Sequence, residues 1–158
     1  NNCMEFNCGN VAGGNYTYLH CTFANYGTDF VRESPSFFIS DNIVLEDNSV
    51  ITGDTYLEIR NSIIDGNMED EMFFDYNGNA TNILAMSDNI LRTTIMDLDT
   101  FGNILNADPK FIAPSMYNYR LDTLSPAKDQ GDFIGVEYDL DGNQRDVMPD
   151  IGAYERIE

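Results

Sequence analysis

The residues best suited to hold a metal ion lie near the C-terminal end, in the run Asp139-Leu140-Asp141-Gly142-Asn143. Asp139, Asp141 and Asn143 place three oxygen-bearing side chains at alternate positions, as calcium-binding loops do. Gly142 stands at the fourth position rather than the sixth, so the run is not an EF-hand loop. Two interpretations remain open: a calcium site, or a tight Asp-Gly turn whose side chains bond to their own backbone.

A second group of residues has the types needed for acid–base chemistry. Arg60 and Arg92 lie on strand-like stretches, close to the carboxylates Asp41, Glu58 and Asp88. A basic residue beside carboxylates can move a proton or help to hold a metal ion. Glu58 and Arg60 are equally expected as ordinary paired charges on the wet face of a strand. No set of two or three carboxylates converges across a groove in the sequence, so we assign no catalytic residue.

The single histidine and the tyrosines are candidate ligand-binding side chains. His20 follows Leu19 in a strand-like stretch, so we expect it to point outward into solvent rather than to act as a general base. Seven of the nine tyrosines have two possible roles: they form a face on which a sugar stacks, or they cover the edges of the core. These seven are Tyr16, Tyr18, Tyr26, Tyr56, Tyr76, Tyr117 and Tyr119.

A short strand–bend–strand unit has to position these residues. In the range 56–66, Leu57 and Ile59 alternate with charged residues, which predicts a strand with one buried face. Asn61-Ser62 interrupts the alternation and predicts a bend before Ile63 begins a second apolar step. Similar stretches recur at 18–23, 38–44, 57–64 and 84–91, with a partial copy at 4–9.

The spacing of these stretches predicts the fold. Their bend residues are Cys21, Asp41, Asn61 and Asp88, which are separated by 20, 20 and 27 residues. Strand-forming units that repeat at such a period cannot bury their own apolar faces, so they stack and pair in parallel. We therefore expect an all-β solenoid, a parallel β-helix, over residues 1–95.

Stacking makes equivalent residues neighbours. At the bends, Asp41, Asn61 and Asp88 are expected to bond to backbone groups of the next coil. The expected interior columns are Leu19, Ile39, Ile59 and Met86 in one, and Phe23, Ile43, Ile63 and Ile90 in the other.

The three cysteines are Cys3, Cys8 and Cys21. They are too few for a disulfide scaffold, and their spacing does not match a zinc site. Cys8 and Cys21 fall on equivalent bend positions. Two interpretations stay open for this pair: a disulfide between stacked coils, or two small buried thiols.

The pattern changes after about residue 95. Four of the five prolines follow Phe101, and no further copy of the unit occurs. A solenoid needs a terminal segment that hides its last coil. We expect residues 96–158 to be that irregular C-terminal cap, wrapped across the end of the stack and along its side.

Charge limits the class of partner. The 158 residues include 8 Lys and Arg against 27 Asp and Glu, which gives a formal net charge of -19. Nucleic acids and anionic membrane surfaces are therefore disfavoured as partners. The sequence has no apolar run of the length that a transmembrane helix needs, so we predict no transmembrane segment.

The second half of the chain resembles a known family. The residues are similar to those of bacterial right-handed parallel β-helix proteins with a pectin-lyase-like fold. The resemblance lies in 61–67 and in the ordered tail motifs 107–111, 119–121, 125–131, 139–145 and 150–155. It implies an extracellular or cell-surface protein, with many relatives in Bacteroidetes-type bacteria. The fold hosts lyases, hydrolases and adhesins, so it does not by itself imply an activity.

We expect a structural, adhesive or glycan- or protein-binding role, with a polysaccharide or another surface protein as the partner. The alternative is a polysaccharide lyase or glycoside hydrolase of the pectin-lyase-like fold. The first stretch begins partway through a coil, so we also expect further N-terminal coils, or a partner chain, to cover that edge.

Overall fold

The computed structural model describes residues 8–27 and 31–157 and confirms the predicted all-β class. Ten strands form three parallel sheets. In spatial order, the first sheet holds β1 (Cys8–Asn10), β4 (Phe37–Ser40) and β9 (Met72–Asp75), and the second holds β10 (Asn82–Ser87), β7 (Thr55–Arg60) and β2 (Gly14–Leu19). The third holds β12 (Ile104–Leu105), β11 (Ile90–Leu91), β8 (Ile63–Gly66) and β3 (Thr22–Asn25).

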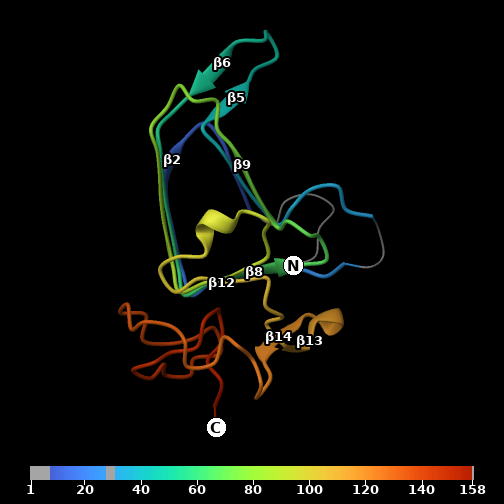
Figure 1. The fold of residues 1–158 in the computed structure, drawn as a ribbon, viewed down its shortest axis with the longest axis vertical. Helices are drawn as coiled ribbons and strands as arrows, with labels where there is room; N and C mark the ends of the chain where they lie inside the picture. Colours follow the sequence, from blue (N-terminus) through green and yellow to red (C-terminus); the bar gives the residue numbers. More distant parts are fainter. Residues whose placement is uncertain (1–7, 28–30, 158) are drawn as a thin grey trace.

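The remaining elements are two antiparallel hairpins and two single-turn 3₁₀-helices. The hairpins pair β5 (Asn42–Val44) with β6 (Val50–Thr52), and β13 (Phe111–Ala113) with β14 (Asn118–Leu121). The 3₁₀-helices are η1 (Met96–Leu98) and η2 (Pro114–Met116). The chain visits the first, second and third sheets in turn, and we call each such passage a circuit. Figure 1 shows the three sheets along three sides of a triangle, with the β5–β6 hairpin projecting from one corner.

The register of the sheets differs from the predicted columns. Ile59 lies beside Met86, and Ile63 beside Ile90, as expected. Tyr18, however, is the neighbour of Ile59 on its other side, because Leu19 pairs with Arg60.

Three more predicted column members lie outside those columns. Phe23 lies opposite Ile64, because Thr22 pairs with Ile63. Ile39 lies in the first sheet beside Phe74, and Ile43 lies in the β5–β6 hairpin. The predicted repeat of 20 residues is therefore wrong. Neighbouring residues of the same corner are 41, 27 and 14 residues apart, and the last step leads from β11 directly to β12 without a strand in the first or second sheet. The 20-residue spacing joins residues at different corners, because Asp41 follows β4 of the first sheet and Asn61 follows β7 of the second.

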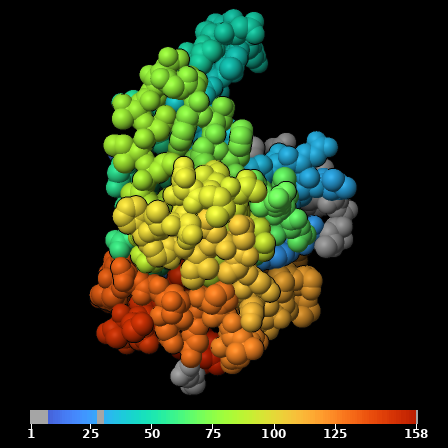
Figure 2. All heavy atoms as spheres, viewed as in Figure 1, coloured from blue at the N-terminus to red at the C-terminus, as the bar shows by residue number. Residues whose placement is uncertain are grey.

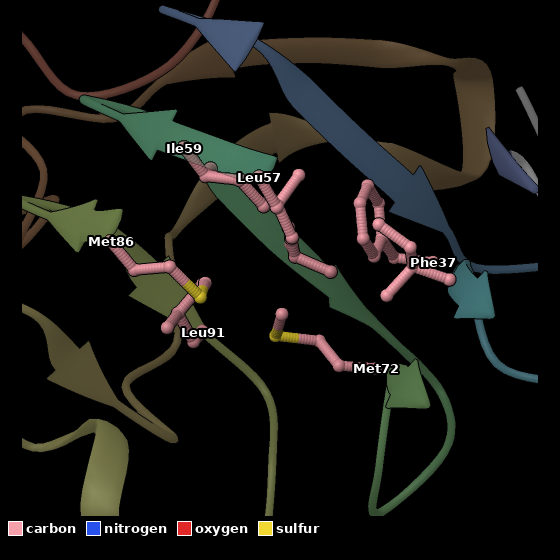
Figure 3. Close-up of a cluster of buried hydrophobic side chains, with 8 residues drawn as sticks. Phe37, Leu57, Ile59, Met72, Met86 and Leu91 are labelled. Carbon is pink, nitrogen blue, oxygen red and sulfur yellow. The ribbon is translucent and has the colours of Figure 1, made fainter. Parts of the chain in front are cut away.

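An apolar core fills the space between the three sheets. Its buried members are Phe37, Ile39, Leu57, Ile59, Ile64, Met72, Met86 and Leu91. Figure 3 shows six of these side chains turned toward a common centre from different strands. Removing an Ile or Leu side chain from water stabilises a fold by about 1.5–3 kcal/mol, so this core accounts for much of the packing energy.

The tail forms a second core on the outer face of the third sheet. Ile63 and Ile90 contact Leu121, Ala127 and Ile151 there. Every residue of β8 is buried, because the sheet is covered on both faces. Figure 1 shows the tail below this sheet. The segment around η1, which also belongs to the predicted range 96–158, places Leu98 against the first core.

A ladder of side chains holds the corner between the second and third sheets. The backbone N–H of Cys21 donates to Ser62 Oγ at 3.0 Å, that of Ser62 to Asn89 Oδ1 at 2.8 Å, and that of Asn89 to Asn103 Oδ1 at 3.1 Å. The expected side-chain bonding at bends is confirmed for Asp41, whose Oδ1 accepts the N–H of Asn77 at 3.0 Å. At the corner between the second and third sheets it occurs one residue later than Asn61 and Asp88. Asn61 instead bonds the tail.

The third sheet continues beyond the predicted division at residue 95. Its strand β12 pairs in parallel with β11, with Ile90 opposite Ile104 and Leu91 opposite Leu105. The assignment of residues 1–95 to the coils and 96–158 to the cap stays a prediction.

Candidate functional site

The predicted calcium loop is organised around Asp139. Its Oδ1 accepts hydrogen bonds from the N–H groups of Asp141 at 2.9 Å and Asn143 at 2.7 Å. Its Oδ2 accepts from Asn143 Nδ2 at 3.1 Å and from the N–H of Glu155 at 2.8 Å. Although partial burial opposes it, these bonds hold the pKa of Asp139 below its usual value. This is the geometry of the Asp-Gly turn interpretation.

Calcium binding by Asp139, Asp141 and Asn143 stays a prediction. The carboxylate of Asp141 is turned to Arg120, with bonds of 2.6 Å from both Nε and Nη2. Within residues 8–27 and 31–157, no three or more His, Cys, Asp or Glu side chains are grouped so that they could hold a metal ion.

The predicted arginine–carboxylate group is dispersed. Arg60 lies 3.8 Å from Asp132 of the tail, whereas Arg92 donates to Asp65 at 2.7 Å. Asp41 is buried at another corner and accepts hydrogen bonds from asparagines. Arg60, Arg92 and Asp41 do not form one acid–base cluster, because they lie at the ends of strands in three different sheets. Glu58 lies on the same strand as Arg60, and Asp88 follows Ser87, which is opposite Arg60.

Two further arginines are committed to buried ion pairs. Arg32 pairs with Glu71, which is 0% exposed and also accepts the N–H of Ser36 at 2.9 Å. Arg145 pairs with Glu155 at 2.9 Å and donates to two backbone carbonyls. A buried charge is tolerated only when it is paired in this way. Both ion pairs therefore have a structural role.

The prediction that His20 points into solvent is wrong. It is 6% exposed, and its Nε2 lies 2.9 Å from Asn61 Nδ2. The tail packs over this corner, which the local alternation of residues does not indicate. Burial, together with the positive charge of Arg145, lowers the pKa of His20 to about 4. The ring is therefore neutral at physiological pH, where a general base would need a pKa nearer to 7.

The cysteines of the described residues are free thiols. Cys8 lies in the first sheet, with its Sγ 3.1 Å from the Tyr18 hydroxyl, and Cys21 lies at a corner of the third. The disulfide interpretation for this pair is wrong, because Cys8 lies on β1 of the first sheet and Cys21 lies at the corner before β3 of the third. Cys3 lies outside the described residues.

Three tyrosines converge at a hollow on the tail, which we call the tyrosine site. Tyr117, Tyr119 and Tyr154 line a hollow of about 310 Å³, together with Thr22, Leu140 and Ala153. Tyr117 is 62% exposed and follows η2 in a left-handed backbone conformation, with φ 58°. Thr22 Oγ1 accepts the N–H of Ala153 at 3.0 Å. This bond ties the tail to β3, so the site depends on the docked tail.

An arginine–carboxylate pair borders the tyrosine site. The Arg120 guanidinium carbon lies 4.8 Å from the ring centre of Tyr154. The same guanidinium forks onto Asp141, so one planar group is fixed against both a ring and a carboxylate. The Asp141 side chain remains 34% exposed and keeps lone pairs for a ligand hydroxyl.

The predicted tyrosine face is only partly present. Tyr16, Tyr18 and Tyr76 pack against the first core, and Tyr26 contacts Phe111. Of the seven predicted tyrosines, only Tyr117 and Tyr119 line the site. Sequence reasoning missed the third tyrosine of the site, Tyr154, because only the docked tail brings it close. Its place in the tail motif 150–155, three residues after Ile151, was the one available signal.

Two larger hollows lie at the end of the sheets that faces the viewer in Figures 1 and 2. One, of about 550 Å³, lies between β10 and the η1 segment. The other, of about 500 Å³, lies beside β9. In Figure 2 the yellow segment that includes η1 covers the middle of this end. Both strands are the outermost of their sheets, so each has one strand neighbour.

Comparison of the chain with models of known protein families, with curated proteins and with solved structures gave no match. Among the described residues, no helix has the length and apolar character that crossing a membrane requires. The function must therefore be argued from the geometry of the site.

Proposed function

We propose that the chain is a glycan-binding part of a secreted or cell-surface bacterial protein, built as a right-handed parallel β-helix. The observation that carries this proposal is the tyrosine site. Its hollow is lined by three tyrosines, and the residues of 8–27 and 31–157 that line it include no carboxylate, imidazole or thiol. Such a lining can hold a ligand, but it offers no group to take or give a proton near neutral pH.

The β-helix part of the proposal is supported by the order of the strands. The chain enters three parallel sheets in the same sequence in successive circuits, and equivalent residues are neighbours across the circuits. The side-chain ladder from Cys21 to Asn103 joins these circuits at one corner. The resemblance of the tail to the capping segment of pectin-lyase-like proteins supports the same architecture and the extracellular location.

Aromatic rings beside a carboxylate suit a sugar. The apolar face of a pyranose ring packs on the flat face of an aromatic side chain, and its hydroxyls then bond polar groups at the rim. Tyr117 and Tyr154 supply the faces, while Asp141 supplies an acceptor at the rim. Because Arg120 already fixes both Tyr154 and Asp141, these side chains lose little conformational entropy when a ligand binds.

The negative net charge of the chain limits the kind of glycan that it can bind. The chain carries a net charge of -19, and Arg120, the cation beside the site, is already paired with Asp141. A polyuronate would be repelled, so we propose a neutral glycan as the ligand. The same charge argues against the alternative function, a lyase acting on uronate polymers, because such an enzyme must attract a polyanion.

A glycan array followed by calorimetric titration of the best neutral ligand tests this function. We expect Tyr117→Ala to weaken binding at least about tenfold, since losing one stacking face costs on the order of 1.4 kcal/mol. Tyr138→Ala is the matched control, because Tyr138 is 57% exposed and lies outside the tyrosine site. Absence of any neutral-glycan binding, or release of unsaturated products from a polyuronate, would contradict the proposal.

A further inference from the structure

The hollow beside β9 is an apolar groove with an acidic rim. Its apolar lining includes Met68, Met72, Phe73 and Ile95, and its charged groups are the carboxylates of Glu33 and Asp70. Flexible thioethers beside aromatic rings adapt to many apolar side chains, which is why peptide-binding surfaces use them. We call this hollow the β9 groove.

The strand that borders the β9 groove has a free edge. The Phe37 N–H donates to Glu71 O at 2.9 Å, and the Asp41 N–H donates to Asp75 O at 3.3 Å. In a parallel ladder, alternate residues face opposite neighbours. The backbone groups of Met72 and Phe74 therefore point away from β4, toward the edge where β9 has no strand neighbour among the part of the chain that the structure describes.

The two rim carboxylates favour a basic partner. Asp70 accepts hydrogen bonds from Thr93 and Thr94, and these hold its pKa below the usual value despite partial burial. The nearest arginines in the chain, Arg32 and Arg92, pair with Glu71 and Asp65. A second copy of a chain with a net charge of -19 would be repelled.

We propose that the β9 groove binds an extended segment of a partner protein, with alternating apolar and basic residues, which pairs with β9 as an added strand. Backbone hydrogen bonds to Met72 and Phe74 would hold the segment in register. Its apolar side chains would enter the groove, and its lysines or arginines would lie beside Glu33 and Asp70. This interaction is separate from glycan binding, because the tyrosine site lies on the tail.

A synthetic peptide of alternating valine and lysine is the probe. We expect saturable binding in a fluorescence anisotropy titration, and slower amide hydrogen exchange at Met72 and Phe74 in the complex. A peptide that is N-methylated at alternate residues should bind about tenfold more weakly or worse, because it cannot form the added ladder. The valine–glutamate peptide should not bind.

Two variants with matched controls locate the interaction. Glu33→Lys should weaken binding of the lysine peptide, whereas Glu46→Lys in the β5–β6 hairpin should not. Phe73→Ser should weaken it as well, with Phe133→Ser as the control, since these phenylalanines are 52% and 56% exposed. Equal binding of the N-methylated peptide, unchanged exchange at Met72 and Phe74, or peptide-independent dimerisation through this groove would overturn the proposal.

Discussion

Ile63 and Ile64 are consecutive residues of β8, yet each belongs to a different core. Ile64 faces the space between the three sheets, and Ile63 faces the tail. Both are 0% exposed. Because neighbouring side chains of a strand point to opposite faces, this one strand joins the core between the three sheets to the tail that carries the tyrosine site.

The two isoleucines should therefore respond differently to truncation. We expect Ile63→Ala and Ile64→Ala each to lower the free energy of unfolding by about 2–5 kcal/mol. Amide hydrogen exchange should distinguish them. Ile63→Ala should speed exchange mainly in the tail, near Leu121 and Ile151, while Ile64→Ala should speed it in the strands of the first core. An identical exchange pattern in both variants would show that the tail and the sheets unfold as one unit.

The corner ladder should contribute measurably to stability. Asn89 Oδ1 accepts the Ser62 N–H, and Asn89 Nδ2 donates to Ile59 O at 2.9 Å. Asn89→Ala would leave these buried backbone groups unpaired, so we expect a loss of about 1–3 kcal/mol for each group in chemical denaturation. Asn79→Ala, at an exposed position, is the control and should change stability by less than about 0.5 kcal/mol. If Asn89→Ala and Asn79→Ala changed the free energy of unfolding equally, the corner ladder would not be stabilising.

His20 should make folding less favourable as the solution becomes acidic. Its pKa is about 4 in the folded chain, below the ordinary 6.5. The unfolded chain therefore takes up a proton first, and this stability is lost as the pH falls from about 6.5 toward 4. The loss from this group should not exceed about 3 kcal/mol.

A variant isolates this effect from other titrating groups. Asp65, Asp150 and Glu155 have pKa values raised by burial, so their contribution to stability changes with pH in the opposite sense. His20→Asn removes the titration, and asparagine tolerates the φ of 50° at this position. Wild type should lose more stability than this variant between pH 7 and pH 4.5. An NMR titration that gives His20 a pKa near 6.5 would refute the explanation.

Local sequence patterns predicted individual strands well. The alternation around Leu57 and Ile59 gave the correct strand and the correct buried face, because a strand repeats every two residues. The repeat length was wrong, because strands of different sheets contain similar short apolar stretches. Nothing local shows that Ile39 lies in the first sheet while Ile59 lies in the second.

Long-range contacts were the part that sequence reasoning could not reach. The pairing of Arg32 with Glu71 and the burial of His20 under the tail both join residues far apart in the chain. The tyrosine site depends on such a contact, because Tyr154 meets Thr22 only after the tail has docked. The Asp-Gly turn was foreseen as one of two interpretations, because Asp139 bonds backbone within its own loop.

The central claim is that successive circuits lie side by side in the observed register, and engineered disulfides test it most directly. In a background without native cysteines, Thr17→Cys with Glu58→Cys should crosslink on oxidation, because these residues are direct neighbours on β2 and β7. Adjacent strands lie about 4.8 Å apart, within the span of a disulfide. Thr22→Cys with Asn42→Cys, a pair that a 20-residue repeat would place close together, should stay reduced, because these residues lie opposite Ile63 and Thr52 instead. A crosslink in the second pair and none in the first would contradict the account.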